Sequence, residues 1–343
     1  MIPGIHIRKN GRAGRITLNR PKALNALTYE MCLAIERALD DWSNDPDIAL
    51  LILDAEGDKA FCAGGDIAEM YASGTRGDFS YGRKFWRDEY RMNARLFRFP
   101  KPVVSFLQGF TMGGGVGVGC HASHRIVDES SQIAMPEVGI GLVPDVGGSL
   151  ILANAPGRLG EYLGTTAARM GPGDAILVGF ADYYVPANGW DALKEGLSET
   201  GDWTLVDAAA TTAPAAALDA VRADIDRHFA GETLADILRS LHTEDTDFTR
   251  ETLKKLKRNA PLSMACAIEM IHRLRGSDSI ERALELEYRF THRAMEHGDF
   301  IEGIRAAIID KDRAPRWRHD RDAALDVDMP KMLRPLGAEA LTL

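Results

Sequence analysis

Two apolar runs, each followed by a glycine-rich loop and a helical pattern, restrict the folds open to this chain most strongly. The first run, IALLILDAEG at residues 48–57, leads into AFCAGGDI at 60–67. The second, KPVVSFLQG at 101–109, leads into GFTMGGGVG at 109–117. Continuous apolar runs of this length are typical of strands buried on both faces. The repeated order of strand, glycine turn and helix predicts an α/β architecture with ligand sites at the strand ends.

The remaining patterns divide the chain into three parts. Residues 5–19 alternate as two short strands, and 28–43 carry helical spacing with Thr28 as a plausible N-cap. Beyond an alanine-rich stretch near 201–222 the pattern is helical. We therefore predict three parts, a core, a helical region and a charged, proline-containing tail expected to be mobile: residues 1–200, 201–320 and 321–343.

Composition excludes several classes of function. The 343 residues carry a formal net charge of −9, which argues against nucleic acid or an anionic membrane as the main partner. No apolar stretch approaches the roughly 20 residues that span a bilayer, and the N-terminus has no signal-peptide pattern. The 4 cysteines lie far apart without a CxxC pair, so we expect neither disulfides nor a zinc site. A reduced, cytoplasmic protein is the simplest interpretation.

The two glycine loops offer backbone donors to a ligand. Gly64 and Gly65 allow close approach of the main chain, and their N–H groups lie near a helix start where donors are unsatisfied. Two such loops can aim two N–H groups at one carbonyl oxygen, which is an oxyanion hole. The alternative is that the glycines serve only tight packing. Neither loop has the Walker or the dinucleotide-binding pattern, so no nucleotide cofactor is predicted.

The stretch MPEVGIGLVPDVGG at residues 135–148 holds two carboxylates, Glu137 and Asp145, among apolar neighbours. Buried acids are costly unless they are paired or used. Prolines and glycines exclude one regular helix here, so we expect the acids to converge from loops. Two nearby carboxylates raise one pKa, which suits a base working near neutral pH. The alternative is that each acid caps a helix.

The three motifs AFCAGGDI, GFTMGGGVG and MPEVGIGLVPDVGG, in this order and spacing, resemble the enoyl-CoA hydratase/isomerase (crotonase) superfamily. The stretches FWRDEYRMN at 85–93 and LELEYRFTHRAMEHGDFIEGIRAAIIDKDRAPRW narrow the resemblance to the 3-hydroxyisobutyryl-CoA hydrolase subfamily. The resemblance implies a crotonase-like (ClpP/crotonase) spiral of ββα repeats with a C-terminal helical region. It also implies an acyl-CoA substrate, no separate cofactor and no metal, and it leaves a homo-oligomer open.

The resemblance assigns roles residue by residue. By position, the oxyanion donors are the N–H groups of Gly65 and Gly114. Backbone around Ala63 and Ile67 receives the adenine part of CoA, and Asp66 beside them is expected to cap the next helix and to border the substrate. Glu89 matches a substrate-contacting glutamate of the subfamily, with a solvated or ion-paired helix face as the alternative.

The acidic positions of the motifs distinguish a hydrolase from a hydratase. Hydratases of the superfamily use two glutamates, and the first of these positions is Gly117 here, which cannot transfer a proton. The second is Glu137, and Asp145 stands where hydratases usually carry glycine. We therefore expect Glu137 to act as nucleophile or general base on 3-hydroxyisobutyryl-CoA, a step of valine catabolism, with Asp145 orienting it. The alternatives are an enoyl-CoA hydratase/isomerase and a non-catalytic CoA-binding protein.

Several other polar residues are weaker candidates. His121 and His124 lie three apart on a predicted helix, but no third ligand accompanies them, so a metal site is not expected. Lys59 and the arginines near 83–91 are candidates for the CoA phosphates, with a solvated face as the alternative. The charged stretch at 299–312 predicts an ion-pair network that docks the helical part.

Overall fold

The computed structural model describes residues 2–320, 325 and 327–343. The chain divides into two compact units, each assembled from three stretches of sequence. Unit 1 is Met1–Asp66, Asp88–Ala134 and Arg169–Ala217, and unit 2 is Ile67–Arg87, Met135–Ala168 and Leu218–Leu343. All described strands belong to unit 1, and the described part of unit 2 consists of helices and loops.

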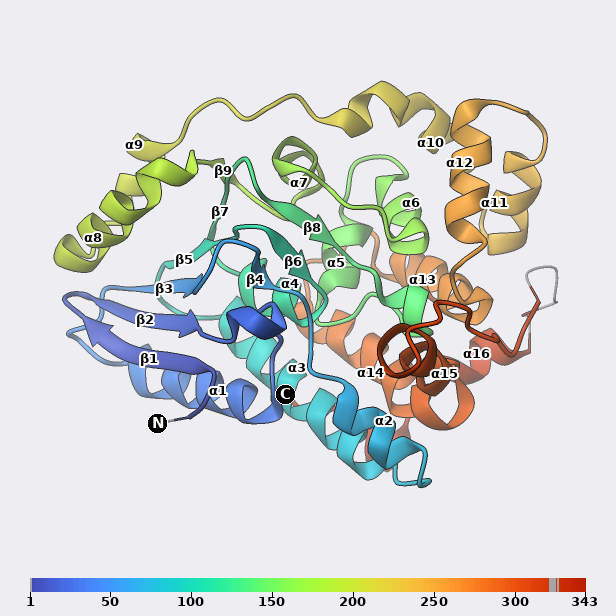
Figure 1. Ribbon diagram of the computed structural model, residues 1–343, viewed down its shortest axis with the longest axis horizontal. Helices are drawn as coiled ribbons and strands as arrows, with labels where there is room; N and C mark the ends of the chain where they lie inside the picture. The colour runs from blue at the N-terminus through green and yellow to red at the C-terminus, as the bar shows by residue number, and fades with distance from the viewer. Residues whose placement is uncertain (1, 321–324, 326) are drawn as a thin grey trace. The chain divides into compact units, whose positions relative to one another are not determined.

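Unit 1 is built on two sheets (Figure 1). The larger has 6 strands in the order β1-β2-β3-β5-β7-β9, and the smaller has 3 in the order β4-β6-β8. Only β1 and β2 pair antiparallel among the described strands, and every other pairing is parallel. The strands are β1 (Ile5–Asn10), β2 (Ala13–Leu18), β3 (Leu50–Ala55), β4 (Ala60–Cys62), β5 (Val103–Phe106), β6 (Phe110–Met112), β7 (His124–Val127), β8 (Gln132–Ala134) and β9 (Tyr183–Tyr184).

One unit of structure repeats along the chain: a strand of the large sheet, a strand of the small sheet, then a helix. β3 and β4 precede α2 (Ala68–Gly74), β5 and β6 precede α4 (Gly114–Gly119), and β7 and β8 precede the 3₁₀ helix η2 (Glu137–Ile140). The crossing from one sheet to the next is tight: Gly109 has φ +55°, and a side chain there would collide with the backbone of Lys59. The predicted spiral of ββα repeats is confirmed.

The apolar runs form buried strands, as their composition predicts. β3 is buried almost throughout, with Leu50 and Ile52 in one core cluster with Trp190 of α8 (Trp190–Thr200). Its other face is also covered, because a Cβ on Gly14 would lie 2.8 Å from the Leu51 side chain and 2.5 Å from the ring of Trp42 of α1 (Tyr29–Ser43). Alternate residues of one strand thus pack against different helices. The predicted N-cap is confirmed, since the Thr28 side chain accepts from the Met31 N–H at 3.3 Å.

Unit 2 buries its core between helices. α13 (Pro261–Leu274) packs against α5 (Gly148–Ala153) and α6 (Leu159–Thr166), and α14 (Ile280–His297) packs against α5, α13 and α15 (Phe300–Ile304). α11 (Leu234–Leu241) and α12 (Asp247–Leu256) begin at capping boxes opened by Thr233 and Thr246. The other α-helices among the described residues are α3 (Ser80–Phe97), α7 (Pro172–Val178), α9 (Leu205–Ala209), α10 (Arg222–His228) and α16 (Asp328–Met332).

Two sequence expectations are wrong in detail. Asp66 does not cap α2, whose N-cap position is Ile67 without a side-chain cap; its carboxylate instead accepts from Arg20 at 3.0 Å. A carboxylate interacts more strongly with a charged guanidinium than with the neutral backbone N–H groups at a helix start, so the ion pair with Arg20 is preferred to a helix cap. His121 and His124 do not share a helix. α4 ends at Gly119, His121 follows in a turn, and His124 opens β7 beside the ring of Tyr183.

The predicted C-terminal tail is partly packed. Residues 321–324 and 326 lie outside the described residues. Beyond them α16 contacts α13 and α14, and Met332 and Leu333 are each 2% exposed. These described residues therefore belong to the core of unit 2 rather than to a free tail. The burial of two large apolar side chains accounts for this order.

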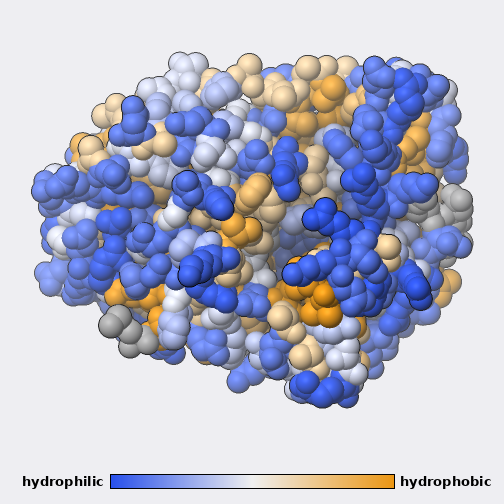
Figure 2. Space-filling view, in the orientation of Figure 1, coloured by the Kyte–Doolittle hydropathy of each residue, from blue (hydrophilic) through white to orange (hydrophobic). Residues whose placement is uncertain are grey.

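No helix among the described residues is long and apolar enough to cross a membrane. In the part of the chain that the structure describes, the exposed large apolar side chains are Phe97, Trp203, Ile308, Ile309, Val327 and Leu343. Figure 2 shows one face of the molecule, on which hydrophilic side chains predominate and hydrophobic ones form small groups.

Candidate active site

The two glycine loops of unit 1 meet at Gly65 and Gly114. Gly65 follows β4 and Gly114 opens α4, and β4 pairs with β6 in the small sheet, which brings the loops together. A Cβ on Gly114 would lie 3.3 Å from the Gly65 nitrogen. Within the described chain neither N–H donates to a backbone carbonyl. Two adjacent, uncommitted N–H groups are the arrangement that an oxyanion hole needs.

Glu89 of α3 lies at the same place. The side chain is 3% exposed, and its Oε1 is 3.0 Å from the position of a Cβ on Gly114. The alternative of a solvated helix face is therefore excluded. The Glu89 charge also contributes to the raised pKa of the buried Cys32 thiol, after burial itself. The structure thus brings Glu89 together with both predicted oxyanion donors.

The backbone expected to receive adenine borders this loop in part. Ala63 and Asp66 are partly exposed, and the Ala63 N–H donates to the Leu24 carbonyl at 3.0 Å. Ile67 begins the next stretch of unit 2 and is also partly exposed. Their role in holding CoA stays a prediction.

In unit 2, Glu137 is the first residue of η2 and is 5% exposed. Its Oε2 has no hydrogen-bond partner among the described residues. Burial raises the pKa of this carboxyl well above its ordinary 4.5, and the neighbouring charges of Asp145 and then Glu287 raise it further. An acid with a raised pKa and a free oxygen is suited to take or hold a proton near neutral pH.

Asp145 lies in the loop between η2 and α5, and it is 4% exposed. The next residue, Val146, has φ +52°, and Gly147 has φ +80°. A β-branched residue in the left-handed region is strained, so the surrounding packing must hold this turn in place. The structure brings Asp145 together with Glu137 and excludes one alternative, because α5 has no side-chain cap from Asp145.

A third buried acid, Glu287 of α14, holds that turn. Its carboxylate accepts from the Gly147 N–H at 2.9 Å, from the Ser149 N–H at 3.3 Å and from the Ser149 hydroxyl. The side chain is 0% exposed. Burial and the charge of Asp145 raise the pKa of Glu287 to about 8. Three buried carboxyls, Glu137, Asp145 and Glu287, thus lie close together in unit 2.

Glu287 is the buried acid beside the candidate pair that the sequence pattern did not single out. Because its helix carries many charged residues, the sequence gives Glu287 the appearance of one more solvent-exposed side chain. One signal was present: Leu284, Tyr288 and Phe290 flank it at the spacing of an apolar face, and a carboxylate on such a face needs a partner.

Replacing Glu287 with alanine is expected to lower the free energy of unfolding by about 2–4 kcal/mol, because buried N–H and O–H donors lose their acceptor and the strained turn is released. Glu285→Ala, on the exposed face of the same helix, is the matched control and is expected to change it by less than about 0.5 kcal/mol. Thermal or denaturant unfolding measures both, and equal effects would contradict the assigned role.

The pH dependence of stability has a definite sign here. The folded-state pKa of Glu287 is about 8 and its ordinary value is 4.5, so the folded state holds this proton more tightly. Its contribution is complete below about 4.5 and is lost as pH rises through about 8. Glu287→Gln is expected to flatten this loss in the same unfolding experiment.

The charged stretch at 299–312 forms the predicted ion-pair network in part. Arg305 pairs with Glu302 at 2.8 Å and with Asp310 and Asp312 at 2.7 Å each. Asp299 instead accepts from the Arg318 N–H at 2.9 Å and packs on Gly141 at the end of η2. The segment therefore supports the element that carries Glu137.

Two of the arginines predicted to bind the CoA phosphates already form ion pairs with carboxylates of the protein. Arg83 pairs with Glu296 at 2.8 Å, and Arg91 pairs with Glu36 at 2.6 Å. Among the described residues, no cluster of three or more histidine, cysteine, aspartate or glutamate side chains is arranged to hold a metal ion.

Comparison with known proteins identifies the family. Residues 13–332 match the family model described as Enoyl-CoA hydratase/isomerase. The mitochondrial 3-hydroxyisobutyryl-CoA hydrolase of Rattus norvegicus is 35% identical over 98% of this chain and 90% of its own length.

Two solved structures share the whole fold. A crystal structure described as an enoyl-CoA hydratase from Rhodobacter sphaeroides 2.4.1 has a TM-score of 0.96 and 56% identity, covering 99% of this chain and 100% of that one. A carnitinyl-CoA dehydratase from Mycobacterium thermoresistibile has a TM-score of 0.94 and 36% identity, covering 99% of each chain. The chain therefore belongs to the enoyl-CoA hydratase/isomerase family and, within it, to the 3-hydroxyisobutyryl-CoA hydrolase subfamily.

Proposed function

We propose that the protein hydrolyses a short-chain 3-hydroxyacyl-CoA thioester, namely 3-hydroxyisobutyryl-CoA, to 3-hydroxyisobutyrate and CoA. The observation that carries the proposal is the buried pair Glu137 and Asp145, with the Glu137 pKa raised by burial and by Asp145. Gly117 occupies the position of the other hydratase glutamate and offers no proton-transferring group. The hydrolase names of relatives that match at least 90% of this chain support the same conclusion.

The roles follow from the chemistry of thioester hydrolysis. The N–H groups of Gly65 and Gly114 stabilise the negative charge that develops on the carbonyl oxygen, each contributing roughly 3–4 kcal/mol. Ionised Glu137 either attacks the carbonyl carbon, releasing CoA thiolate and leaving an anhydride that water cleaves, or removes a proton from the attacking water. In both routes the C–S bond breaks, the thiolate takes up a proton, and water supplies one oxygen of the product. Asp145 orients the acid or the water, and Glu89 contacts the substrate.

A hydratase is the second candidate, because the 56% identical Rhodobacter structure carries that description. A hydratase adds water across a double bond and releases no thiol. The two activities therefore differ in a product that is directly measurable. A non-catalytic CoA-binding protein is disfavoured by the retention of both acids and both loops.

The proposal also covers the cofactor requirement, the metabolic pathway, the cellular compartment and the oligomeric state. We propose no separate cofactor or metal, since CoA is part of the substrate, and a place in valine catabolism. All 4 cysteines are free and buried, which supports a reducing compartment such as the cytoplasm; the rat relative is named mitochondrial. Cell fractionation and sedimentation test the compartment and a homo-oligomeric state.

The deciding experiment measures free thiol released from 3-hydroxyisobutyryl-CoA, with hydration of crotonyl-CoA followed in parallel. We expect rapid thiol release and negligible hydration. Hydration without thiol release would overturn the hydrolase proposal in favour of the hydratase. Binding of CoA without either reaction would favour a binding protein. Comparison with 3-hydroxypropionyl-CoA measures the contribution of the single methyl group, about 1–3 kcal/mol.

A further inference from the structure

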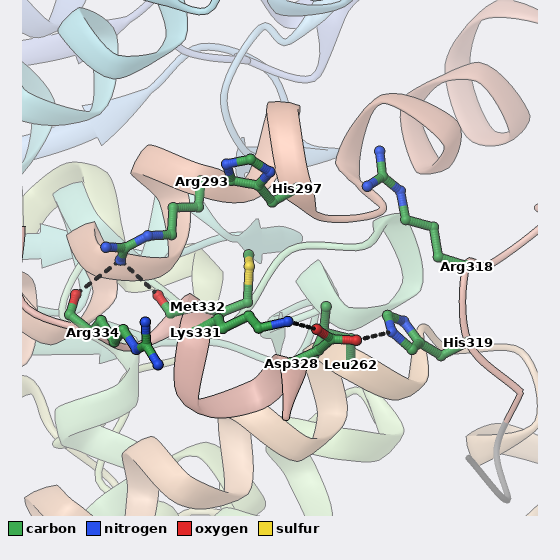
Figure 3. Close-up of a pocket in the computed structure, with 9 residues that line it drawn as sticks. All are labelled: Leu262, Arg293, His297, Arg318, His319, Asp328, Lys331, Met332 and Arg334. Carbon is green, nitrogen blue, oxygen red and sulfur yellow. Dashed lines mark hydrogen bonds and ion pairs between the residues drawn. The ribbon is translucent and has the colours of Figure 1, made fainter. Parts of the chain in front are cut away.

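A pocket of about 510 Å³ in unit 2 lies outside the residues assigned to catalysis. Figure 3 shows Arg293 and His297 from α14 on one side, and Asp328, Lys331 and Met332 from α16 on the other. Its lining is Leu262, Arg293, His297, Arg318, His319, Asp328, Lys331, Met332 and Arg334. The volume is within the range of small-molecule sites, roughly 300–1,000 Å³.

The lining carries an excess of positive charge. Four permanent cations face a single carboxylate, Asp328. That carboxylate is already engaged, since His319 Nε2 and Lys331 Nζ each lie 2.9 Å from its oxygens (Figure 3). Within the described residues, the guanidinium groups of Arg318 and Arg334 form no ion pair, although the charge of Asp299, which accepts from the Arg318 backbone N–H, acts on Arg318 from nearby. Because the whole chain has a net charge of −9, this local excess is not a reflection of composition.

Arg293 is held in position by the backbone. Its Nη1 donates to the carbonyl oxygens of Arg334 at 2.9 Å, Arg289 at 3.0 Å and Met332 at 3.1 Å. These bonds fix the guanidinium but do not neutralise it. Burial lowers the pKa of Arg293, and the like charges of Arg289 and Arg334 lower it further. Like charges held this close repel, so an anion between them is stabilising.

We propose that this pocket binds a phosphate-bearing anion. A planar guanidinium presents paired N–H donors that match phosphate oxygens, and the pocket offers three such groups. A ligand with a single carboxylate carries one negative charge and would leave most of the excess positive charge of the pocket unbalanced. A phosphate monoester carries a charge of about −1.5 to −2 and balances more of it. The buried Leu262 and Met332 add an apolar surface for the group that bears the phosphate. The phosphate belongs either to the CoA portion of the substrate, which rests on the proposed function, or to a separate small molecule.

The test titrates the protein with inorganic pyrophosphate and with ADP in a calorimeter at low salt. Arg334→Gln is expected to weaken pyrophosphate binding about tenfold, and the double variant Arg318→Gln/Arg334→Gln about a hundredfold. Arg313→Gln removes the same charge from an exposed position outside the pocket and is expected to leave the affinity within about twofold. Binding weakens with added salt, because the contacts are ionic.

A second arm separates the two sources of phosphate. The variants are assayed with the CoA thioester and with the pantetheine thioester, which lacks the phosphates of the 3′-phosphoadenosine end. A raised KM for the CoA thioester alone assigns the pocket to the substrate, and an unchanged KM with lost pyrophosphate binding assigns it to a separate ligand. The proposal is overturned if wild type binds neither probe and KM is unchanged, or if Arg313→Gln weakens binding equally. The pyrophosphate arm needs no catalysis, so failure of the proposed function is recognised separately.

Discussion

Glu137→Gln is expected to reduce the kcat of thiol release about 10³-fold or more while leaving the fold intact. Glutamine has the same shape, but it can neither attack the thioester carbon nor accept a proton from water. Glu137 is 5% exposed and its Oε2 has no hydrogen-bond partner in the described chain, so the loss of the carboxylate removes no structural bond from that atom. KM is expected to change little, because the role assigned to Glu137 belongs to the chemical step.

The pKa of Glu137 adds two further expectations to the same experiment. Because burial and Asp145 raise this pKa well above 4.5, the wild-type rate should fall on the acid side at a higher pH than an ordinary carboxylate predicts. The folded state also holds this proton more tightly than the unfolded state, so the contribution to stability is lost as pH rises through the raised pKa. Above that window Glu137→Gln is expected to raise the melting temperature, by on the order of 2 °C.

Rate, pH profile and melting temperature together distinguish this role from a structural one. Glu195→Gln, an exposed residue of α8, is the matched control and is expected to leave all three unchanged. If Glu137→Gln keeps its activity, the acid is not the nucleophile or base. If the variant loses activity and also melts earlier, Glu137 supports the fold instead of the reaction.

The fold could be predicted from the local sequence pattern because the central strands of the large sheet are continuous apolar runs. Residues 48–57 became β3 and residues 101–109 became β5, and both lie in the middle of the large sheet, where both faces are covered. The glycine loops were visible for the same reason: a chain that turns sharply from strand to helix needs glycine at fixed places. These signals are local in sequence and need no knowledge of distant contacts.

The parts that sequence did not predict depend on contacts between distant residues. Asp66 was expected to cap a helix, but it pairs with Arg20, 46 residues away. Glu287 holds the turn after Asp145 from 140 residues away along the chain, at Gly147. The roles of Asp66 and Glu287 depend on which helix packs against which loop. The hydrophobic pattern of a helix predicts only which of its faces will be buried. The candidate acids themselves were predicted, because polar residues in an apolar, glycine-rich stretch stand out without any partner.

Gly114→Ala is expected to lower the kcat of thiol release about 10²–10³-fold, as much as the loss of one oxyanion donor, although alanine keeps its backbone N–H. The new Cβ would lie 3.0 Å from Glu89 Oε1 and 3.3 Å from the Gly65 nitrogen, beside the two N–H groups that we propose as donors to the carbonyl oxygen. The backbone accepts alanine here, since Gly114 begins α4 without a positive φ. The loss should therefore come from blocked access to both N–H groups while the protein stays folded.

Two other glycines test whether space at this point, and not glycine in general, is what the reaction needs. Gly171→Ala places its Cβ where no atom lies within 4 Å, so we expect wild-type rate and melting temperature. Gly115→Ala drives its Cβ against the backbone of Cys62, so we expect a lower melting temperature. A Gly114→Ala variant that behaves like Gly171→Ala would contradict the oxyanion role, and one that melts early like Gly115→Ala would make it a packing residue. Full stability with a slow rate would place the methyl group against the bound substrate, at the oxyanion donors or at Glu89, because a methyl group that costs no stability can slow the reaction only where the substrate must lie.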